Sequence, residues 1–170
     1  MSFEFLVIEH KNLDVWNLHN IIKLKQDHWK YSYESQKKWI DDNMNPADLH
    51  LLLKKDGELV AYLAISFVEI ATDSRLVTVM GIGNVCVSLK HIKQGFGKLI
   101  VEKSNEIIRQ RGYLGILLCH PMLLPFYEKC GWFNVKYNRL NVGKAESSAM
   151  IMTLDFPIEE GSNIEIDRNF

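Results

Sequence analysis

The sequence has no apolar run long enough to cross a membrane. A membrane-spanning helix needs about 20 consecutive apolar residues, and polar or charged side chains interrupt every apolar stretch of this chain before that length. The first residues, Met1-Ser2-Phe3-Glu4, also lack the basic start of a secretory signal. We therefore expect a cytoplasmic protein with no membrane partner.

The chain also lacks an excess of charge and a pattern of cysteines. Its formal charge is -1, and Lys and Arg are spread along it, so nucleic acid is not expected as a partner. The three cysteines, Cys86, Cys119 and Cys130, have neither CxxC nor Cys/His spacing, so we expect no metal site and no disulfide framework. Cys86 and Cys119 lie inside apolar runs and are predicted to be buried.

What the sequence does contain is enough apolar residues for one core. Of its 170 residues, 47% are apolar, and this length supports one well-formed core but not two ordinary domains. We expect a single domain over residues 1–170, with its core over about 3–155. The acidic segment 156–170 is predicted to be a loosely held C-terminal tail.

Apolar periodicity and turn residues predict an alternation of strands and helices. Asp56-Gly57 between two apolar runs is a hairpin signal. The predicted strands are Phe3–Glu9, Leu49–Lys55, Glu58–Ala71, Leu76–Val87, Tyr113–Cys119, Trp132–Tyr137 and Ala149–Asp155. The predicted helices are a segment capped by Asn12 or Asp14 whose period reaches Lys25, then Glu34–Met44, residues 95–111 and residues 124–131, with a polar loop over Asn141–Ser148. The strand at Tyr113–Cys119 should run parallel to Leu76–Val87, because a helix connects the two.

The stretch from Asn84 to Leu99 combines features that favour phosphate binding. An apolar strand passes through a short polar loop into Gly95 and Gly97, and then into a segment of helical period. Glycine permits a tight turn and close backbone approach, and a helix N-terminus favours an anion. The pattern predicts a pyrophosphate cradle, although the same glycines also fit a plain strand-to-helix turn.

Two motifs make the chain similar to a known superfamily. The first is Val85-Cys86-Val87 followed by Gln94-Gly95-Phe96-Gly97, and the second is Pro125-Phe126-Tyr127-Glu128-Lys129-Cys130-Gly131-Trp132. With the predicted order β-α-α-β-β-β-α-β-α-β-β, the chain resembles the GNAT superfamily of N-acetyltransferases from Phe3 to about Asp155. The resemblance implies an α/β (α+β) fold, with a mixed six- to seven-stranded sheet, about four flanking helices, and a splay between the fourth and fifth strands.

The resemblance also implies a reaction, in which an acetyl group passes from acetyl-CoA to a primary amine of a small molecule or peptide. The amine attacks the thioester directly, and the protein is expected to be a monomer or homodimer. The Val87 N–H would bond the thioester oxygen, and Tyr127 would protonate the departing thiolate; a core tyrosine with a satisfied hydroxyl is the alternative for Tyr127. The implied contacts to acetyl-CoA come from Val85, Val87, Lys93, Gln94, Gly95, Phe96, Gly97, Lys98 and His120.

The chain departs from the family pattern within these contacts. Ile92 stands where the family usually has Arg or Gln at the start of the glycine loop, so Lys93, Gln94 or Lys98 would supply the missing polar contact. His120 stands where the family often has Asn, seven residues before the tyrosine.

The general base is the least defined part of the predicted site. Gly81 and Gly83 occupy the face of the fourth strand where many relatives keep a glutamate. Glu69, near the end of the third strand, is then the best candidate base, with His120 and His91 behind it. A water chain to bulk solvent is the alternative that needs no single base.

Several acidic residues lie in segments that flank the acceptor side in the family. Their negative charge would favour a cationic amine such as a polyamine, an aminoglycoside or a peptide amine. These residues are Asp27, Glu34, Asp41, Asp42 and Glu69. Gly131-Trp132 adds a faint similarity to aminoglycoside N-acetyltransferases. Two other functions stay open, a non-catalytic acyl-CoA-binding sensor or interaction protein, and a structural α/β domain with no CoA site.

Overall fold

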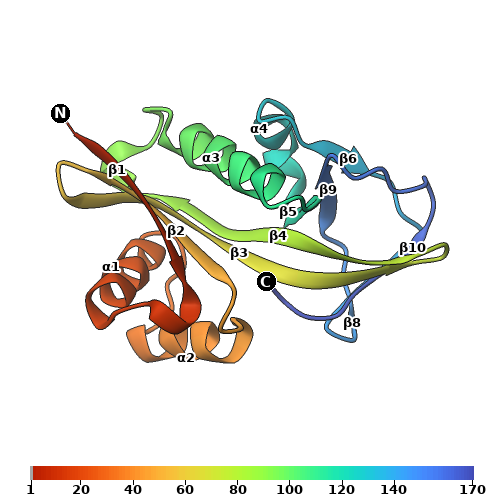
Figure 1. Ribbon diagram of the computed structural model, residues 1–170, viewed down its shortest axis with the longest axis horizontal. Coiled ribbons are helices and arrows are strands. Elements are labelled where there is room, and N and C mark those ends of the chain that lie inside the picture. Colours follow the sequence, from red (N-terminus) through yellow and green to blue (C-terminus); the bar gives the residue numbers. More distant parts are fainter. Residues whose placement is uncertain (1) are drawn as a thin grey trace. The chain divides into compact units, whose positions relative to one another are not determined.

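Helices and strands follow each other along the chain in the predicted order (Figure 1). The computed structural model describes residues 2–170. The strands are β1 (Phe3–Glu9), β2 (Leu49–Lys55), β3 (Glu58–Thr72), β4 (Leu76–Val87), β5 (Gly115–Cys119), β6 (Phe133–Val135), β7 (Arg139–Val142), β8 (Ala145–Glu146), β9 (Met150–Leu154) and β10 (Asn163–Ile166). The α-helices are α1 (Val15–Gln26), α2 (Tyr33–Asn43), α3 (Phe96–Gln110) and α4 (Leu124–Glu128), and the 3-10 turns are η1 (His10–Asn12), η2 (Leu89–His91) and η3 (Pro121–Leu123). The mixed α/β fold with four helices over residues 2–170 is confirmed, with more strands than expected.

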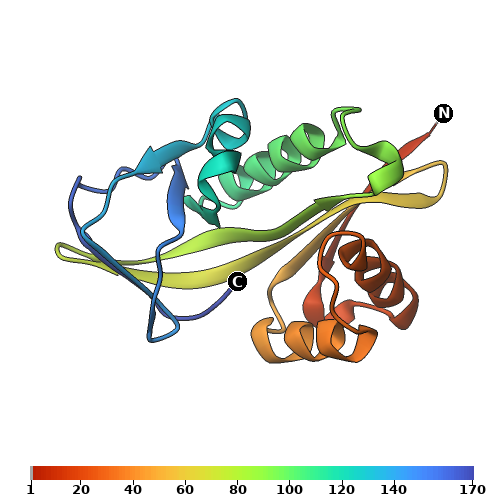
Figure 2. The ribbon, with the colours of Figure 1, turned by 180° about the vertical axis from the view of Figure 1, so that it is seen from behind.

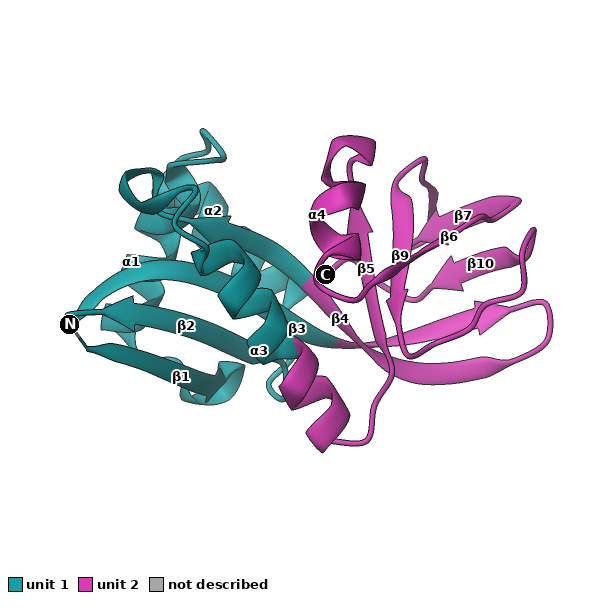
Figure 3. Ribbon diagram, turned by 90° about the horizontal axis from the view of Figure 1, so that it is seen from above, with its two compact units in different colours: residues 1–66, 83–104 teal, residues 67–82, 105–170 magenta. Residues whose placement is uncertain are grey.

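The chain forms two compact units (Figure 3). The first comprises residues 1–66 and 83–104, and the second comprises residues 67–82 and 105–170. Strands β3 and β4 and helix α3 contribute residues to both. Each unit has its own cluster of buried apolar side chains.

The first unit is a strand ladder with helices on both faces. β1 pairs antiparallel with β2, and β2 pairs antiparallel with β3. At the hairpin between β2 and β3, Asp56 and Gly57 have φ angles of 49° and 84°, the left-handed conformations that a two-residue hairpin turn requires. Helices α1 and α2 cover one face of this ladder, and the first part of α3 lies on the other (Figures 1 and 2).

Side-chain caps and apolar packing fix α1 and α2. Asp14 accepts a hydrogen bond from the N–H of Asn17 at 2.8 Å, and Ser32 accepts one from the N–H of Ser35 at 3.1 Å, so both helices begin at a capping side chain. Asp14 is one of the two caps predicted for α1. The buried cluster beneath the helices comprises Ile21, Ile22, Leu24, Ile40, Met44, Leu52, Tyr62, Ala64 and Cys86.

The second unit is a mixed sheet that contains both parallel and antiparallel strand pairs. Hydrogen bonding orders its strands β6-β9-β5-β4-β3-β10-β7-β8. β4 runs parallel to β5, from Met80 opposite Gly115 to Ile82 opposite Leu117, as the connecting helix predicted. β9 is antiparallel to both β5 and β6. The buried cluster of this unit comprises Val68, Ile70, Val79, Ile116, Val135, Leu140, Val142, Ile151, Phe156, Ile164 and Ile166.

Two segments predicted to lack strands contain them. The loop expected over Asn141–Ser148 includes the end of β7 and all of β8, which pair across a turn at Gly143 and Lys144. The tail 156–170 contains β10, which is antiparallel to β3 and parallel to β7. Ile164 and Ile166 of β10 are buried. Their alternation with polar residues is a strand pattern. The prediction missed this strand because it rested on the acidic composition of the tail.

Candidate active site

The loop between β4 and α3 has the backbone conformation of an anion-binding turn. Lys93 has a φ angle of 60° and Gly95 one of 88°, so left-handed residues lie on both sides of Gln94. Successive N–H groups in turns of this kind form a concavity that accepts an anion. The φ angle at Gly95 is one that residues with a side chain rarely adopt, which is the physical reason for a glycine there.

The first turn of α3 adds further N–H groups to this loop. Leu99 donates its N–H to the carbonyl of Gly95 at 3.0 Å, so Gly95 is the residue that precedes the helix. The N–H groups of Phe96, Gly97 and Lys98 therefore have no acceptor within the helix, and the positive end of the helix dipole lies beside them. This geometry fits the backbone contacts predicted for a pyrophosphate.

The polar side chains of the loop have local partners. Gln94 donates from Nε2 to the carbonyl of Lys90 at 3.3 Å, and Nζ of Lys98 lies 3.6 Å from the carboxylate of Glu102. Ile92 is 48% exposed. The side chains of Gln94 and Lys98 are therefore already engaged within the loop and α3.

Phe96 and His91 pack on each other beneath the loop. Phe96 is 7% exposed, and its ring centroid lies 5.8 Å from that of Phe3 and 5.9 Å from that of His91. Nδ1 of His91 is buried and has no hydrogen-bond partner within residues 2–170. The side chain of Phe96 anchors the loop, so its contact with a ligand is limited to its N–H.

The end of β4 presents backbone groups at the edge that faces away from β3. Ser88 donates its N–H to the carbonyl of Val60 on β3 at 2.9 Å. Because the peptide group is planar and trans, the carbonyl of Val87 points to the opposite edge, where Nε2 of His28 donates to it at 2.7 Å. In an extended strand the N–H of Val87 points the same way as its carbonyl. This N–H is the one predicted to bond the thioester oxygen.

A left-handed residue interrupts β4 just before these groups. Asn84 has a φ angle of 54°, and such a residue within a strand produces a bulge that re-aims the residues after it. Val85, which follows it directly, is half-buried, as is Val87.

Tyr127 lies in α4 of the second unit among two thiols and an aromatic ring. It is 6% exposed, and its ring centroid lies 4.9 Å from that of Phe126. Burial raises the pKa of Tyr127 far above its ordinary value of 10.0, and the nearby thiols of Cys119 and Cys130 act in the same direction. The phenol therefore stays protonated at neutral pH, which is the state that a proton donor needs.

Buried hydrogen bonds hold the motif that carries Tyr127. Trp132 is 1% exposed and donates from Nε1 to Oδ1 of Asn105 at 2.9 Å. Nδ2 of Asn105 in turn donates to the carbonyl of Cys130 at 2.8 Å. The backbone N–H of Trp132 donates to the carbonyl of Tyr127 at 3.1 Å. A tryptophan at this position thus fixes the turn that ends α4.

Comparison with known proteins decides the family. A family model described as an acetyltransferase (GNAT) domain matches residues 11–134. The chain belongs to the GNAT family. The match includes the glycine loop and all of the second motif up to Trp132, so the resemblance inferred from the sequence is confirmed. A comparison with curated proteins gives no match.

Solved structures of GNAT proteins share the fold of this chain at low sequence identity. ElaA from Escherichia coli is 22% identical, with a TM-score of 0.63 over 89% of this chain and 98% of that chain. YhbS from Escherichia coli, solved in complex with CoA, is 18% identical, with a TM-score of 0.66 over 97% of this chain and 91% of that chain. PaiA N-acetyltransferase from Thermoplasma acidophilum, also in complex with coenzyme A, is 16% identical, with a TM-score of 0.60 over 91% of this chain and 99% of that chain. Within residues 2–170, none of the helices is both long and apolar enough to span a membrane.

The ring of Phe170 lies against Gly81, one of the two glycines on the face of β4 where a glutamate is common in the family. A Cβ atom at Gly81 would lie 2.6 Å from Cδ2 of this ring, closer than real Cβ contacts. A side chain at this position would therefore require the ring of Phe170 to move.

The other base candidates include Glu69, whose backbone is hydrogen-bonded, and His120, whose side chain caps a turn. Glu69 is exposed, and its N–H and carbonyl bond to the carboxylate and N–H of Asp167 at 2.9 and 3.1 Å. It lines a cavity of about 490 Å³ with Lys144 and Glu165, and these contacts do not bring it together with Tyr127. His120 accepts at Nδ1 from the N–H that follows Pro121, at 3.3 Å, and so caps η3. Their roles in acetyl transfer stay predictions.

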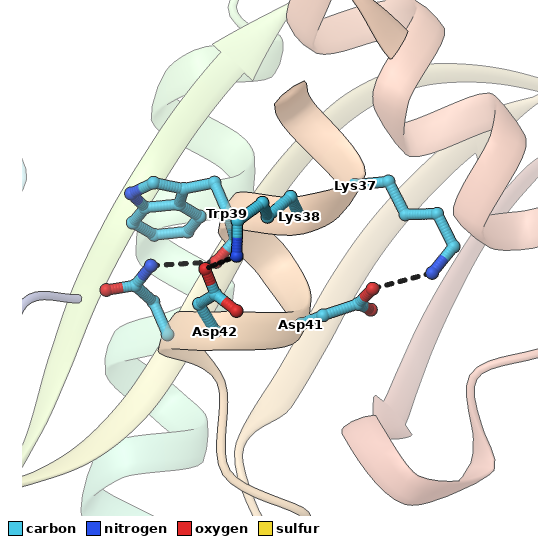
Figure 4. Close-up of polar contacts among 6 residues, drawn as sticks. Lys37, Lys38, Trp39, Asp41 and Asp42 are labelled. Carbon is cyan, nitrogen blue, oxygen red and sulfur yellow. Dashed lines mark hydrogen bonds and ion pairs between the residues drawn. The ribbon is translucent and has the colours of Figure 1, made fainter. Parts of the chain in front are cut away.

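Two of the acidic residues expected to attract a cationic acceptor are paired within α2 (Figure 4). Lys37 lies 2.6 Å from Asp41, and Lys38 lies 2.6 Å from Asp42, each one turn apart on the exposed face. A lysine therefore balances the charge of each carboxylate. Asp27 is also engaged, since its carboxylate accepts the N–H of Leu89 at 3.4 Å. The electrostatic argument for a cationic acceptor is correspondingly weaker than the sequence suggested.

A buried chain of titratable side chains in the first unit was not predicted. Nδ1 of His50 lies 2.8 Å from the hydroxyl of Tyr62, and its Nε2 lies 3.0 Å from Nδ1 of His10. Burial, followed by the charges of His10 and Lys25, lowers the pKa of His50 to about 3, so its imidazole is neutral. The available signal was a histidine on the same strand face as Leu52, inside a leucine-rich run.

Lys25 is a buried cation close to the hydrogen-bonded series His10–His50–Tyr62. It is 2% exposed, and its Nζ lies 4.7 Å from the ring centroid of Trp39 and 5.9 Å from that of Trp29. Burial lowers the pKa of Lys25 to about 8, while the thiol of Cys86 acts in the opposite direction. The helical period had already placed a lysine on the buried stripe of α1, but not its aromatic neighbours.

Proposed function

We propose that this GNAT protein transfers the acetyl group of acetyl-CoA to a primary amine of a small molecule or peptide. The observation that carries the proposal is the loop from Lys93 to Lys98, where left-handed residues and the first turn of α3 turn several N–H groups to one side. Membership of the GNAT family supports acyl-CoA as the ligand of this loop. Acetyl as the acyl group and an amine as the acceptor are part of the proposal.

The residues of the chain divide the work of this reaction. Backbone N–H groups of the loop hold the pyrophosphate, and the Val87 N–H stabilises the negative charge that develops on the thioester oxygen. Tyr127 protonates the departing thiolate, a contribution of about 10²–10⁴-fold for a positioned acid. His120 and the side chain of Val85 contact the co-substrate.

An assay of thiol release tests the proposal directly. The protein is mixed with acetyl-CoA and, separately, with a polyamine, an aminoglycoside and a peptide with a free amine. We expect one acceptor class to raise release of the CoA thiol above the rate without amine. Tight binding of acetyl-CoA with no release for any amine would favour the sensor function. A CoA site also predicts stabilisation by about 2.7 kcal/mol at a hundred times Kd, and no rise in melting temperature would argue against the site itself.

A carboxylate in the first turn of α3 should weaken acetyl-CoA binding. Gly97→Glu places a side chain and a negative charge beside the N–H groups that are proposed to hold the pyrophosphate. We expect at least a tenfold loss of affinity, about 1.4 kcal/mol, measured by calorimetric titration. Gln110→Glu adds the same charge at the far, exposed end of α3 and should leave binding unchanged. Undiminished affinity in Gly97→Glu would remove the loop as the phosphate site.

A further inference from the structure

The loop after α1 bonds to the backbone at the end of β4. Nε2 of His28 donates to the carbonyl of Val87 at 2.7 Å, and the carboxylate of Asp27 accepts the N–H of Leu89 at 3.4 Å. Two consecutive loop residues thus hold the backbone on either side of Ser88. The carbonyl of Val87 leaves the strand at the same edge as the N–H that is proposed to bind the thioester oxygen. The backbone of Val87 therefore binds the His28 imidazole through its carbonyl and is proposed to bind the thioester oxygen through its N–H.

The contact with Val87 decides which nitrogen of His28 carries the proton. A carbonyl oxygen only accepts, so Nε2 must be the donor. A neutral imidazole has one N–H, so Nδ1 of His28 carries a free lone pair. The His28 side chain is exposed to solvent.

Local hydrogen bonds fix the position of the His28 backbone. The N–H groups of His28 and Trp29 both donate to the carbonyl of Lys25, at 3.1 and 2.9 Å. Nε2 of Gln36 on α2 donates to the carbonyl of Trp29 at 3.2 Å. The His28 ring also packs on the Trp29 ring, with centroids 5.9 Å apart. Hydrogen bonds to α1 and α2 therefore hold the backbone of this loop, and the bond to β4 holds the imidazole itself.

We propose that His28 is the general base of the acetyl transfer. The inference rests on the proposed function, and it answers the absence of a carboxylate at Gly81 and Gly83, because the base then comes from the loop after α1 instead of from β4. Neither Glu69 nor His120 makes a contact with the Val87 backbone of this kind.

The step balances in atoms and charge. Nδ1 of His28 takes one proton from the ammonium group of the acceptor and passes it to solvent. The nitrogen lone pair then forms a bond to the thioester carbonyl carbon, and the C–S bond breaks with its electron pair on sulfur. The nitrogen gives its second proton to Nδ1, and the sulfur takes a proton from Tyr127. His28 then releases this proton to solvent and the Tyr127 phenolate takes one from solvent, which restores both side chains. The products are the amide, the free thiol and one net proton.

A glutamine at position 28 separates the two roles of the histidine. Its side-chain amide can still donate an N–H to the Val87 carbonyl, but it has no titrating nitrogen. With the best acceptor of the amine panel, we expect His28→Gln to lower kcat about 10²-fold or more, with the affinity for acetyl-CoA unchanged. His19→Gln is the matched control, because His19 is on α1 and packs on Tyr33; it should keep the wild-type rate.

Two further measurements decide whether the loss is that of a base. Added imidazole should restore part of the rate of His28→Ala. Nitrogen NMR of the free protein should show the His28 tautomer with its proton on Nε2.

The outcomes distinguish a failure of His28 as the base from a failure of the proposed acetyltransferase function. Wild-type turnover in His28→Gln, a His28→Ala variant that imidazole does not rescue, or a proton on Nδ1 would each overturn the base while leaving the acetyltransferase function in place. Binding of acetyl-CoA by the wild type with no thiol release for any amine would overturn both.

Discussion

The Tyr127→Phe variant is expected to lose about 10²–10⁴-fold in kcat while keeping the acetyl-CoA affinity of the wild type. The substitution removes only the hydroxyl, so the ring keeps its packing on Phe126, and the carbonyl of residue 127 keeps its bond from the N–H of Trp132. A loss confined to kcat is the signature of an interaction made only in the transition state. Steady-state kinetics and calorimetric titration of acetyl-CoA measure the two parameters.

The environment of Tyr127 adds a pH test of the same role. A proton donor loses activity as pH rises through its pKa, and burial raises the pKa of Tyr127 well above 10.0. Tyr127 should therefore produce no basic limb in the kcat profile below pH 10. Tyr113→Phe, a half-buried tyrosine that packs on Phe67, is the control and should turn over normally. Full activity in Tyr127→Phe would leave Tyr127 as a core residue only.

The second large effect concerns stability. Lys25→Met should raise the free energy of unfolding at pH 7 by about 2 kcal/mol, because it replaces a buried cation with an apolar side chain of similar volume. Lowering the pKa of Lys25 from 10.5 to about 8 corresponds to about 3 kcal/mol of destabilisation below pH 8. The contacts with Trp29 and Trp39 offset part of that cost.

The sign of the pH dependence follows from the two pKa values. Between about pH 8 and 10.5 the unfolded chain binds the proton of Lys25 more strongly than the folded chain, so wild-type stability rises with pH across this window. The advantage of Lys25→Met should therefore be largest below pH 8 and shrink towards pH 10.5. Urea unfolding at several pH values measures it, with the exposed Lys23→Met on the same helix as control. Destabilisation by Lys25→Met at pH 7 would contradict the expectation.

The sequence pattern was sufficient to predict most of the fold, because most helices, strands and turns depend on residues that are close in sequence. The hairpin at Asp56-Gly57 and the parallel pairing of β4 with β5 follow from turn residues and from the connecting helix. β10 was missed because its four residues alternate within an acidic tail, and their pairing with β3 and β7 is a tertiary contact.

The part of the proposed site that the sequence did not predict depends on a long-range contact. His28 lies 59 residues from Val87 in the sequence, and the loop that carries it has no clean period. The turn from β4 into α3, which we propose to bind the pyrophosphate, could be predicted because its glycines and the helix start are adjacent in the chain. The contact of Phe170 with Gly81 joins residues far apart in the sequence and has no local signal.

Strand β10 has a consequence for the solubility of the protein. It lies between β3 and β7 in the sheet and bonds to both. Without it, two strands would each expose a row of unpaired N–H and carbonyl groups, and such edges pair readily with other chains. The acidic residues around β10 led to the prediction of a loosely held tail. They belong instead to the segment that protects the second unit from edge-to-edge aggregation.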